Sequence, residues 1–199
     1  MQVARMIKKI KTKLIGKRIV LKTTKPDLTM AEVMFKVISE NRKHLRPWFP
    51  WEKSTKKVED SLKYLFDKEE KVKAGEKVEY GIYVDNEYIG NIGIFSINTK
   101  KRSAEIGYWL SVKFIRKGYA TEAVRTLEKE FFAKGLNRIQ IKCDERNTAS
   151  AGVAKKCGYV LEGRLREDSY SKYFKDFSNT LVFSKLKKDF KKTKQQSKL

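Results

Sequence analysis

The chain has 199 residues, of which 40% are hydrophobic and 12% aromatic, and its formal net charge is +22. That length and apolar content support one domain with its own core and exclude a wholly disordered chain. The charge is uneven, because residues 1–25 contain nine basic and no acidic residues, and residues 185–199 contain seven basic residues and one acidic residue. These two ends carry +15 of the +22, so the interior is a mildly basic globular domain.

Several classes of protein are disfavoured by what the chain lacks. No apolar run approaches the roughly 18 residues needed to cross a bilayer, and lysines stand near the N-terminus where a signal peptide needs an apolar stretch. We therefore expect a cytoplasmic protein without a membrane partner. Two cysteines, Cys143 and Cys157, and one histidine, His44, are too few for a disulfide framework or a zinc site. We expect no metal, and no hydrolase that depends on a histidine base.

Hydrophobic periodicity and turn residues predict the elements of the first half of the chain. Apolar residues at three- and four-residue steps among lysines favour a short basic amphipathic helix over 1–14. Pro47 and Pro50 end a long helix, and Asp85 and Asn86 supply a hairpin turn. The elements that we expect after this first helix are a strand over 18–22, helices over 26–45 and 55–74, and strands over 80–84 and 88–97.

In the second half of the chain, strands and helices alternate. The expected elements are a strand over 104–110, a helix over 118–133, a strand over 138–143, a helix over 148–156, and strands over 159–166 and 179–186. Residues 187–199 contain almost no apolar side chains and are expected to form a solvated tail. Strands interleaved with helices, with antiparallel hairpins at both ends, predict a mixed α/β sheet and not a doubly wound one.

The segment 105–123 contains the first chemical signal. A strand ends near Leu110, a turn holds Arg116, Lys117 and Gly118, and a helix follows. Backbone N–H groups at a helix N-terminus lack intrahelical partners, and the positive end of the helix dipole favours an anion. The turn therefore suits a phosphate or pyrophosphate, although a glycine at such a turn is also common without any ligand.

The segment 147–159 is a second strand-to-helix element. Asn147 stands at a helix N-cap position and Ser150 follows in the first turn. Gly158 stands where a helix C-terminus favours a left-handed residue. Capping alone explains Asn147 nearly as well as a binding role does, and the two roles are compatible.

Together the two segments resemble the Gcn5-related N-acetyltransferase (GNAT) superfamily. There the pattern Gln/Arg-x-x-Gly-x-Gly/Ala holds the pyrophosphate of coenzyme A, and here it falls on residues 115–120. Ile115 stands where Gln or Arg is usual, but backbone N–H groups are expected to make most of the phosphate contacts. The pattern of Asn147 and Ser150 is similar to ribosomal-protein N-terminal acetyltransferases of the RimJ/RimL type. Three further segments fit that subgroup, namely 45–51, 104–110 and 162–166.

The resemblance runs from about residue 16 to 187. It implies a basic N-terminal extension (1–15), an acetyltransferase domain (16–187) and a basic C-terminal tail (188–199). It also implies a GNAT-type α/β fold, in which a mixed, mostly antiparallel sheet with a central splay is flanked by helices, and acetyl-CoA as cosubstrate. Backbone groups of Leu110 and Val112 are implied to hold the pantetheine arm and the thioester carbonyl. The other residues implied to bind the coenzyme are Arg116, Lys117, Gly118, Tyr119, Ala120, Thr121, Asn147 and Ser150.

Acetyl transfer to an amine needs a base for the amine and a proton for the departing sulfur. Glu105 is the candidate base, acting directly or through water, because it lies on the strand expected to line the cleft; the alternative is a solvated strand charge. Ser150 is the candidate to hydrogen-bond or protonate the sulfur, with an ordinary helix-surface serine as the alternative. Trp48, Trp51 and Tyr108 are candidates for the acceptor wall, although aromatic residues between prolines also serve as core plugs.

The acceptor is the least determined part of the interpretation. Free α-amines have a pKa near 7.7–8.0 and lysine near 10.4, so an α-amine needs less help from a base. The leading hypothesis is transfer from acetyl-CoA to a protein N-terminal α-amine, such as that of a ribosomal protein. A second hypothesis is a small acceptor, for example a polyamine, an amino acid or an antibiotic. A third is a non-catalytic RNA- or ribosome-binding protein on the same scaffold, supported by the basic termini and Ile115.

Overall fold

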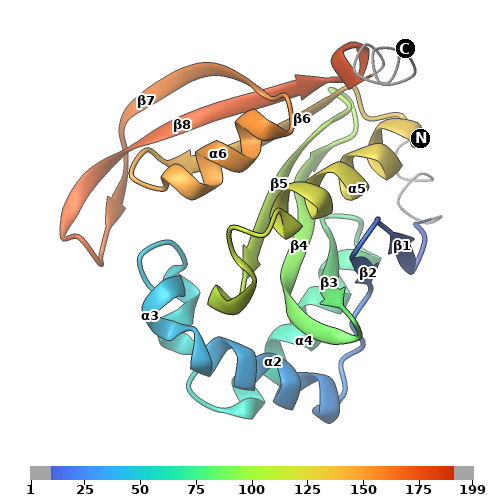
Figure 1. Cartoon of the computed structure of the whole chain (residues 1–199), viewed down its shortest axis with the longest axis vertical. Coiled ribbons are helices and arrows are strands. Elements are labelled where there is room, and N and C mark those ends of the chain that lie inside the picture. Colours follow the sequence, from blue (N-terminus) through green and yellow to red (C-terminus); the bar gives the residue numbers. More distant parts are fainter. Residues whose placement is uncertain (1–9, 191–199) are drawn as a thin grey trace.

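The structure, a computed structural model, describes residues 10–190. An eight-stranded sheet in the order β1-β2-β3-β4-β5-β6-β8-β7 has helices against both faces (Figure 1). The strands are β1 (Lys13–Ile15), β2 (Val20–Lys22), β3 (Val78–Val84), β4 (Glu87–Asn98), β5 (Ser103–Leu110), β6 (Arg138–Asp144), β7 (Val160–Ser171) and β8 (Asp176–Leu186). The helices are α2 (Leu28–Glu40), α3 (Arg42–Leu45), α4 (Val58–Lys73), α5 (Tyr119–Ala133) and α6 (Thr148–Lys156), with short 3-10 turns η1 (Pro50–Ser54) and η2 (Val112–Phe114).

The sheet divides between β5 and β6. β4 pairs with β5 as far as Leu110, and β8 pairs with β6 as far as Asp144. β5 and β6 run parallel but pair only over Ser103–Glu105 and Arg138–Gln140. The other strand pairs of this sheet are antiparallel. The expected mixed, mostly antiparallel sheet with a central splay is therefore confirmed, and the splay opens directly beyond Glu105.

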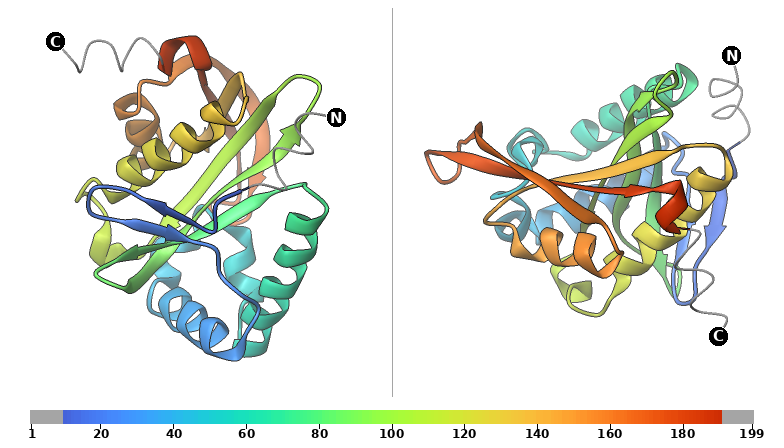
Figure 2. Two further views of the ribbon diagram at one scale, coloured as in Figure 1. Left: turned by 90° about the vertical axis from the view of Figure 1, so that its right-hand side faces the viewer. Right: turned by 90° about the horizontal axis from the view of Figure 1, so that it is seen from above.

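Two apolar cores lie on the two faces of the sheet. α5 and α6 pack on one face, where Leu127 and Phe131 are fully buried. α2, α3 and α4 cover the other face, and Met34 packs there with Trp109. Figure 2 shows α5 and the pair α2–α4 on opposite sides of the strands. Because neighbouring residues of a strand point to opposite faces, Trp109 joins the α2–α4 core while Tyr108 faces the α5–α6 side.

Most of the elements that position the site form where the sequence predicts them. α5, α6, β5 and β6 lie over nearly the expected ranges. The β3–β4 hairpin turns at Asp85 (φ 48°) and Asn86 (φ 66°), two left-handed residues that give the type I′ geometry favoured in tight hairpins. No helix within residues 10–190 is both long enough and apolar enough to cross a membrane.

The single helix expected over 26–45 is wrong, because the structure has two helices that meet at Asn41. This residue leaves helical geometry (φ −117°, ψ 11°). Its side-chain Nδ2 donates to the carbonyl of Val37 (2.7 Å), and its Oδ1 accepts from the N–H of Val112 (2.7 Å). The break is therefore made by a contact with a segment far along the chain, which helical periodicity does not report.

The helix expected over 1–14 is also wrong at its C-terminal end. Lys13–Ile15 form strand β1, which pairs antiparallel with β2. Burial alternates along these residues, and only Leu14 points into the core, as in a strand. Residues 10–12 are not helical either, and the part of this prediction over residues 1–9 lies outside the described residues.

The last hairpin and the segment after it differ from expectation as well. β7 and β8 continue beyond the predicted 159–166 and 179–186 and meet at a turn over residues 172–175. Residues 187–190 are helical, and the Phe190 ring lies 5.2 Å from that of Phe132. The solvated tail is therefore wrong for these residues, because an aromatic side chain anchors them to α5. Residues 191–199 lie outside the described residues.

Candidate active site

The splay opens into a cleft of about 1260 Å³ that both halves of the sheet line. Its walls come from β5 and β6, the N-termini of α5 and α6, the segment from α3 to α4, and the turn of the β7–β8 hairpin. The predicted site residues that line it are Glu105, Tyr108, Leu110, Arg116, Gly118, Tyr119, Ala120, Thr121, Asn147, Ser150 and Trp48. The predicted site residues that do not line it are Val112, Lys117 and Trp51.

The turn before α5 has the shape of an anion cradle. Arg116 (φ 59°) and Gly118 (φ 84°) both have left-handed backbone conformations, and α5 begins directly after them. The N–H groups of residues 119–121 at the helix start have no intrahelical acceptor, and the helix dipole adds positive potential. Arg116 lines the cleft, whereas Lys117 places its Nζ 5.5 Å from the centre of the Phe114 ring. The cradle therefore fits a diphosphate, with one of the two predicted cations beside it.

Arg18, from the β1–β2 turn, supports this cradle and was not predicted. Its Nη1 donates to the carbonyl O of Lys117 (3.1 Å), and its Nε pairs with Glu122 (3.0 Å). The guanidinium also covers the ring of Tyr119 at 4.7 Å. A Cβ added at Gly118 would lie 3.2 Å from Arg18 Nη2. No local pattern signals this role, because Arg18 and Lys117 are 99 positions apart.

Ser150 and Tyr108 form a hydroxyl pair inside the cleft, with 3.1 Å between Ser150 Oγ and the phenol oxygen. Ser150 lies in the first turn of α6, where Asn147 caps the helix by accepting from the Ser150 N–H (3.0 Å). Burial raises the pKa of the Tyr108 hydroxyl well above its ordinary value, so the phenol stays protonated at neutral pH. Tyr108 was predicted only as part of the acceptor wall. In the structure it contacts Ser150, the candidate proton donor.

Glu105 lies where β5 and β6 part. Its Oε2 accepts from Gln140 Nε2 (3.2 Å) and lies 3.7 Å from Lys142 Nζ. Asp168 of β7 is a further carboxylate in the cleft lining, and it makes no ion pair with any residue of the described range. Asp168 was not predicted as a site residue, because it lies beyond residue 166, where the predicted strand ends. The cleft therefore offers two candidate bases, one held by neighbours on β6 and one on the hairpin.

The backbone of Leu110 and Val112 is less free than the resemblance implies. Leu110 is still in register with Gly90 of β4. The N–H of Val112 donates to Asn41 Oδ1, so this group already has an acceptor. Unpaired backbone groups lie instead along the β6-facing edge of residues 106–110, where β5 has no strand partner.

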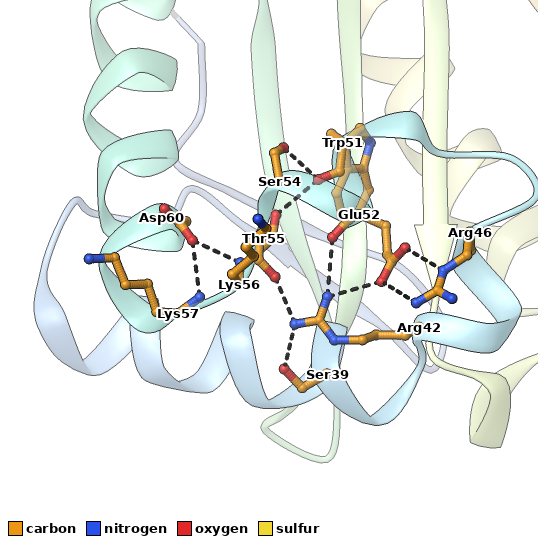
Figure 3. A network of polar contacts seen from close by, with 10 residues as sticks. All are labelled: Ser39, Arg42, Arg46, Trp51, Glu52, Ser54, Thr55, Lys56, Lys57 and Asp60. Carbon is orange, nitrogen blue, oxygen red and sulfur yellow. Dashed lines mark hydrogen bonds and ion pairs between the residues drawn. The ribbon is translucent and has the colours of Figure 1, made fainter. Parts of the chain in front are cut away.

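A buried carboxylate holds the segment predicted as the acceptor wall (Figure 3). Glu52, only 1% exposed, accepts from Arg46 Nε (2.9 Å) and from Arg42 Nη1 (2.9 Å). Arg42 Nη1 also donates to the Glu52 carbonyl (3.1 Å). The hydrogen bonds from Arg46 and Arg42 hold the pKa of the Glu52 carboxyl below its usual value, against the effect of burial. This network fixes η1 against α3 and so shapes the loop between them.

Trp48 and Trp51 have different surroundings although they belong to the same loop. Trp48 lines the cleft, and its ring lies 5.9 Å from that of Phe174 in the hairpin turn. Trp51 packs its ring at 6.0 Å from Trp109 and 5.4 Å from Phe49. Of the two, Trp48 is placed to form a wall of the cleft, whereas Trp51 contacts aromatic neighbours without lining the cleft and is 36% exposed, so it is not a core plug.

The two cysteines are free thiols. Burial raises the pKa of Cys143, which lines the cleft, and raises that of Cys157 to about 12. Both thiols are therefore protonated at neutral pH and are poor nucleophiles. Within residues 10–190, no group of three or more His, Cys, Asp or Glu side chains could hold a metal ion.

Comparison of the whole structure with solved proteins defines the class. The microcin C7 self-immunity acetyltransferase MccE, solved with acetyl-CoA and AMP, matches with a TM-score of 0.80 and 25% identity over 86% of this chain and 93% of that one. RimL, the ribosomal L7/L12 alpha-N-protein acetyltransferase, solved with coenzyme A, has the same fold with a TM-score of 0.80 and 22% identity over 86% of this chain and 96% of that one. The split sheet is thus an acetyltransferase fold.

The sequence match then gives the family. The family described as acetyltransferase (GNAT) domain matches residues 18–160. Over 138 residues, which are 69% of this chain and 77% of the other, the sequence is 28% identical to ribosomal-protein-serine acetyltransferase of Escherichia coli strain K12. The chain therefore belongs to the GNAT acetyltransferase family and is an N-acetyltransferase. The resemblance to the RimJ/RimL type is confirmed.

Proposed function

We propose that the chain transfers the acetyl group of acetyl-CoA to the α-amine at the N-terminus of a polypeptide. The observation that carries the proposal is one cleft that joins an anion cradle at α5 to Glu105 and the Ser150–Tyr108 hydroxyl pair. The similarity to a protein named ribosomal-protein-serine acetyltransferase supports a polypeptide acceptor.

The residues at the α5 end fit the coenzyme. N–H groups of residues 119–121 would hold the diphosphate, with Arg116 adding charge and Gly118 allowing close approach. The unpaired edge of β5 over 106–110 would hold the amides of the pantetheine arm. Bound there, acetyl-CoA supplies an activated acyl group, and the chain supplies orientation and proton transfer.

Glu105 is the proposed base. Lys142 and Gln140 hold its carboxylate at the mouth of the splay, beside the unpaired edge of β5. About a tenth of an α-amine is neutral at pH 7, so the base has only to take the proton released as the N–C bond forms, directly or through a water. A lysine side chain, with a pKa near 10.4, would need far more help from a base than an α-amine does.

Ser150 is the proposed partner of the sulfur as the C–S bond breaks. Its hydroxyl lies at the N-terminus of α6, where the helix dipole favours developing negative charge. Tyr108 stays protonated through the neutral range and orients the Ser150 hydroxyl through the 3.1 Å contact. Asn147 fixes the same helix turn from its capping position, so its role here is to position Ser150.

A direct assay tests the proposal. The purified full chain is given acetyl-CoA with peptides that have a free N-terminus, with the same peptides blocked at the N-terminus but containing lysine, or with polyamines and amino acids. Release of free thiol and the mass of the product are measured. We expect saturable acetylation of the free N-terminus at low peptide concentration. Turnover confined to small amines, or to lysine side chains, would contradict it.

Two variants test the choice of base within that assay. Glu105→Gln should lower kcat by about 100-fold, because it removes a proton acceptor while keeping the side-chain shape. Asp168→Asn is the matched control in the same cleft and should change kcat by less than about threefold if Glu105 is the base. A larger loss of kcat in Asp168→Asn than in Glu105→Gln would instead assign the role of base to Asp168.

A further inference from the structure

Three lysines that line the cleft form no ion pair with an acidic side chain of residues 10–190. Lys53 lies in η1, Lys56 lies between η1 and α4, and Lys172 lies in the turn of the β7–β8 hairpin. All three are exposed and line the cleft, and none forms an ion pair with a residue of 10–190. We call these three residues the lysine rim.

The loop that leads into η1 touches the hairpin turn that carries Lys172. The Trp48 ring lies 5.9 Å from the Phe174 ring, which joins the α3–η1 loop to the hairpin turn. Arg146 places its guanidinium 4.2 Å from the centre of the same Phe174 ring and fixes the turn from the other side. Figure 1 shows the hairpin tip reaching toward α3, away from the start of α5. The rim therefore lies at the end of the cleft opposite the anion cradle.

The acidic groups near the rim do not cancel its charge. Glu105 lies 3.7 Å from Lys142, and Asp144 makes a 2.7 Å ion pair with Arg146. Glu52 is buried between Arg42 and Arg46. Among the carboxylates that line the cleft, Asp168 is the one without an ion pair in the described chain, whereas the rim contributes three lysines. The mouth is therefore net positive.

We propose that the acceptor is a polypeptide N-terminus whose following residues are acidic; this rests on the proposed function. Carboxylates of the acceptor residues that pass the rim would interact with it across a Debye length, roughly 8 Å at physiological salt. Complementary charge of this kind raises the rate of productive encounter. The same positive potential favours the neutral form of the entering amine and opposes polyamines, whose other amino groups are cations.

The first experiment compares three peptides with the same first residue. Positions two to eight are rich in Asp and Glu, rich in Lys and Arg, or neutral. For the full chain at low salt, we expect kcat/KM for the acidic peptide to exceed that for the neutral peptide by about tenfold, and that for the basic peptide by more. The preference for the acidic peptide should fall steeply between 50 mM and 500 mM NaCl. The KM for acetyl-CoA, measured at saturating peptide, has its own salt dependence and is recorded separately.

Charge-reversal variants locate the preference. Lys53→Glu combined with Lys172→Glu should erase or invert the preference and leave the KM for acetyl-CoA within about twofold. Lys63→Glu combined with Lys129→Glu is the matched control, because both lysines are exposed on α4 and α5 and do not line the cleft. The control pair should keep the wild-type preference, and its thermal unfolding should match that of the rim pair.

The outcomes separate this inference from the proposed function. Equal kcat/KM for the three peptides at low salt would overturn the acidic acceptor while the N-terminal acetylation stands. A preference for the acidic peptide that survives in the Lys53→Glu, Lys172→Glu variant would also overturn the proposal, because the rim would not be its source. Acetylation of small amines with no peptide reaction would overturn both. Strong inhibition by polyuridine that the rim variant relieves, with no preference among peptides, would assign the rim to nucleic acid and not to the acceptor.

Discussion

The two ends of the cleft are built from different parts of the polypeptide. At the α5 end, the shape comes from backbone, namely the left-handed conformations of Arg116 and Gly118 and the free N–H groups that follow them. At the acceptor end it comes from side chains, with Glu52 buried between two arginines and Trp48 against Phe174. The shape of the α5 end therefore depends mainly on backbone conformation, and the shape of the acceptor end depends mainly on which side chains are present.

This difference explains how relatives with one fold can differ in their acceptors. A ligand held by backbone groups tolerates Ile115 where Gln or Arg is usual, because the N–H groups remain. An acceptor held by side chains changes when a few of them change. Damage at the α5 end should accordingly raise the KM for acetyl-CoA, and damage at the hairpin end should raise the KM for the acceptor.

The largest effect should follow from charge placed in the anion cradle. Gly118→Glu adds a carboxylate beside the diphosphate, and a repulsion of about 4 kcal/mol would lower kcat/KM for acetyl-CoA by roughly 1000-fold. Gly158→Glu is the matched control, since Gly158 also has a left-handed φ (77°) with nothing within 4 Å of an added Cβ and lies outside the cleft lining. Full activity of the Gly118 variant would remove the cradle from the coenzyme site.

The next effect should fall on kcat and spare binding at both ends. Ser150→Ala and Tyr108→Phe each remove one member of the hydroxyl pair, and Ser150→Ala should lower kcat by about 100-fold. The double variant should be little worse than Ser150→Ala, because Tyr108 acts through Ser150. Coenzyme A affinity, measured by calorimetry, should stay within about threefold. Additive losses in kcat would mean that Tyr108 has a contact of its own with the reacting atoms.

A smaller effect should separate the two tryptophans of the acceptor loop. Trp48→Ala should raise the KM for the acceptor by about tenfold and leave that for acetyl-CoA unchanged, because Trp48 lines the acceptor end. Trp51→Ala should instead lower the free energy of unfolding by about 2 kcal/mol through its lost packing on Trp109. Steady-state kinetics and chemical denaturation are measured on both variants. Equal changes in acceptor KM and in free energy of unfolding for the two variants would contradict this difference in roles.

The last effect is on stability alone, namely the pH dependence of the free energy of unfolding that Glu52 contributes at the acceptor end. The folded pKa of Glu52 is depressed, so its contribution is present above the unfolded value near 4.3 and is lost as pH falls through the lower folded value. Glu52→Gln should lower the free energy of unfolding by about 2 kcal/mol at pH 7, and the gap between the two proteins should narrow as pH falls below the unfolded value. Glu162→Gln, on an exposed pair with Arg138, should cost less than about 1 kcal/mol. If the difference in free energy of unfolding between wild type and Glu52→Gln did not change with pH, the stabilising role of the ionised Glu52 would be contradicted.

The parts of the site that the sequence predicts are those with a local signature. A glycine before an amphipathic helix and a polar cap before a second one mark residues 115–120 and 147–150, and both segments line the cleft. The period-two pattern of β5 and β6 predicts the strands on either side of the splay. These features depend on neighbours within one or two helical turns, so a single sequence contains the information.

The parts that escape prediction are contacts between distant segments. Asn41 meets Val112 across 71 positions, and Tyr108 meets Ser150 across 42. Each such residue looks ordinary in its own segment, as Asn41 does inside a continuous apolar period. The helix break and the hydroxyl pair are therefore tertiary features, and so is the placement of Asp168 in the cleft.

The position of Arg18 in the chain bears on when the anion cradle forms during folding. Its guanidinium reaches Lys117 and Glu122, so the turn between the first two strands braces a loop about a hundred residues later in the chain. Contacts of such large sequence separation are slow to form, because the entropy of closing the intervening chain is lost before they gain anything. We therefore expect the anion cradle to be completed late in folding, and a partly folded chain to bind acetyl-CoA weakly.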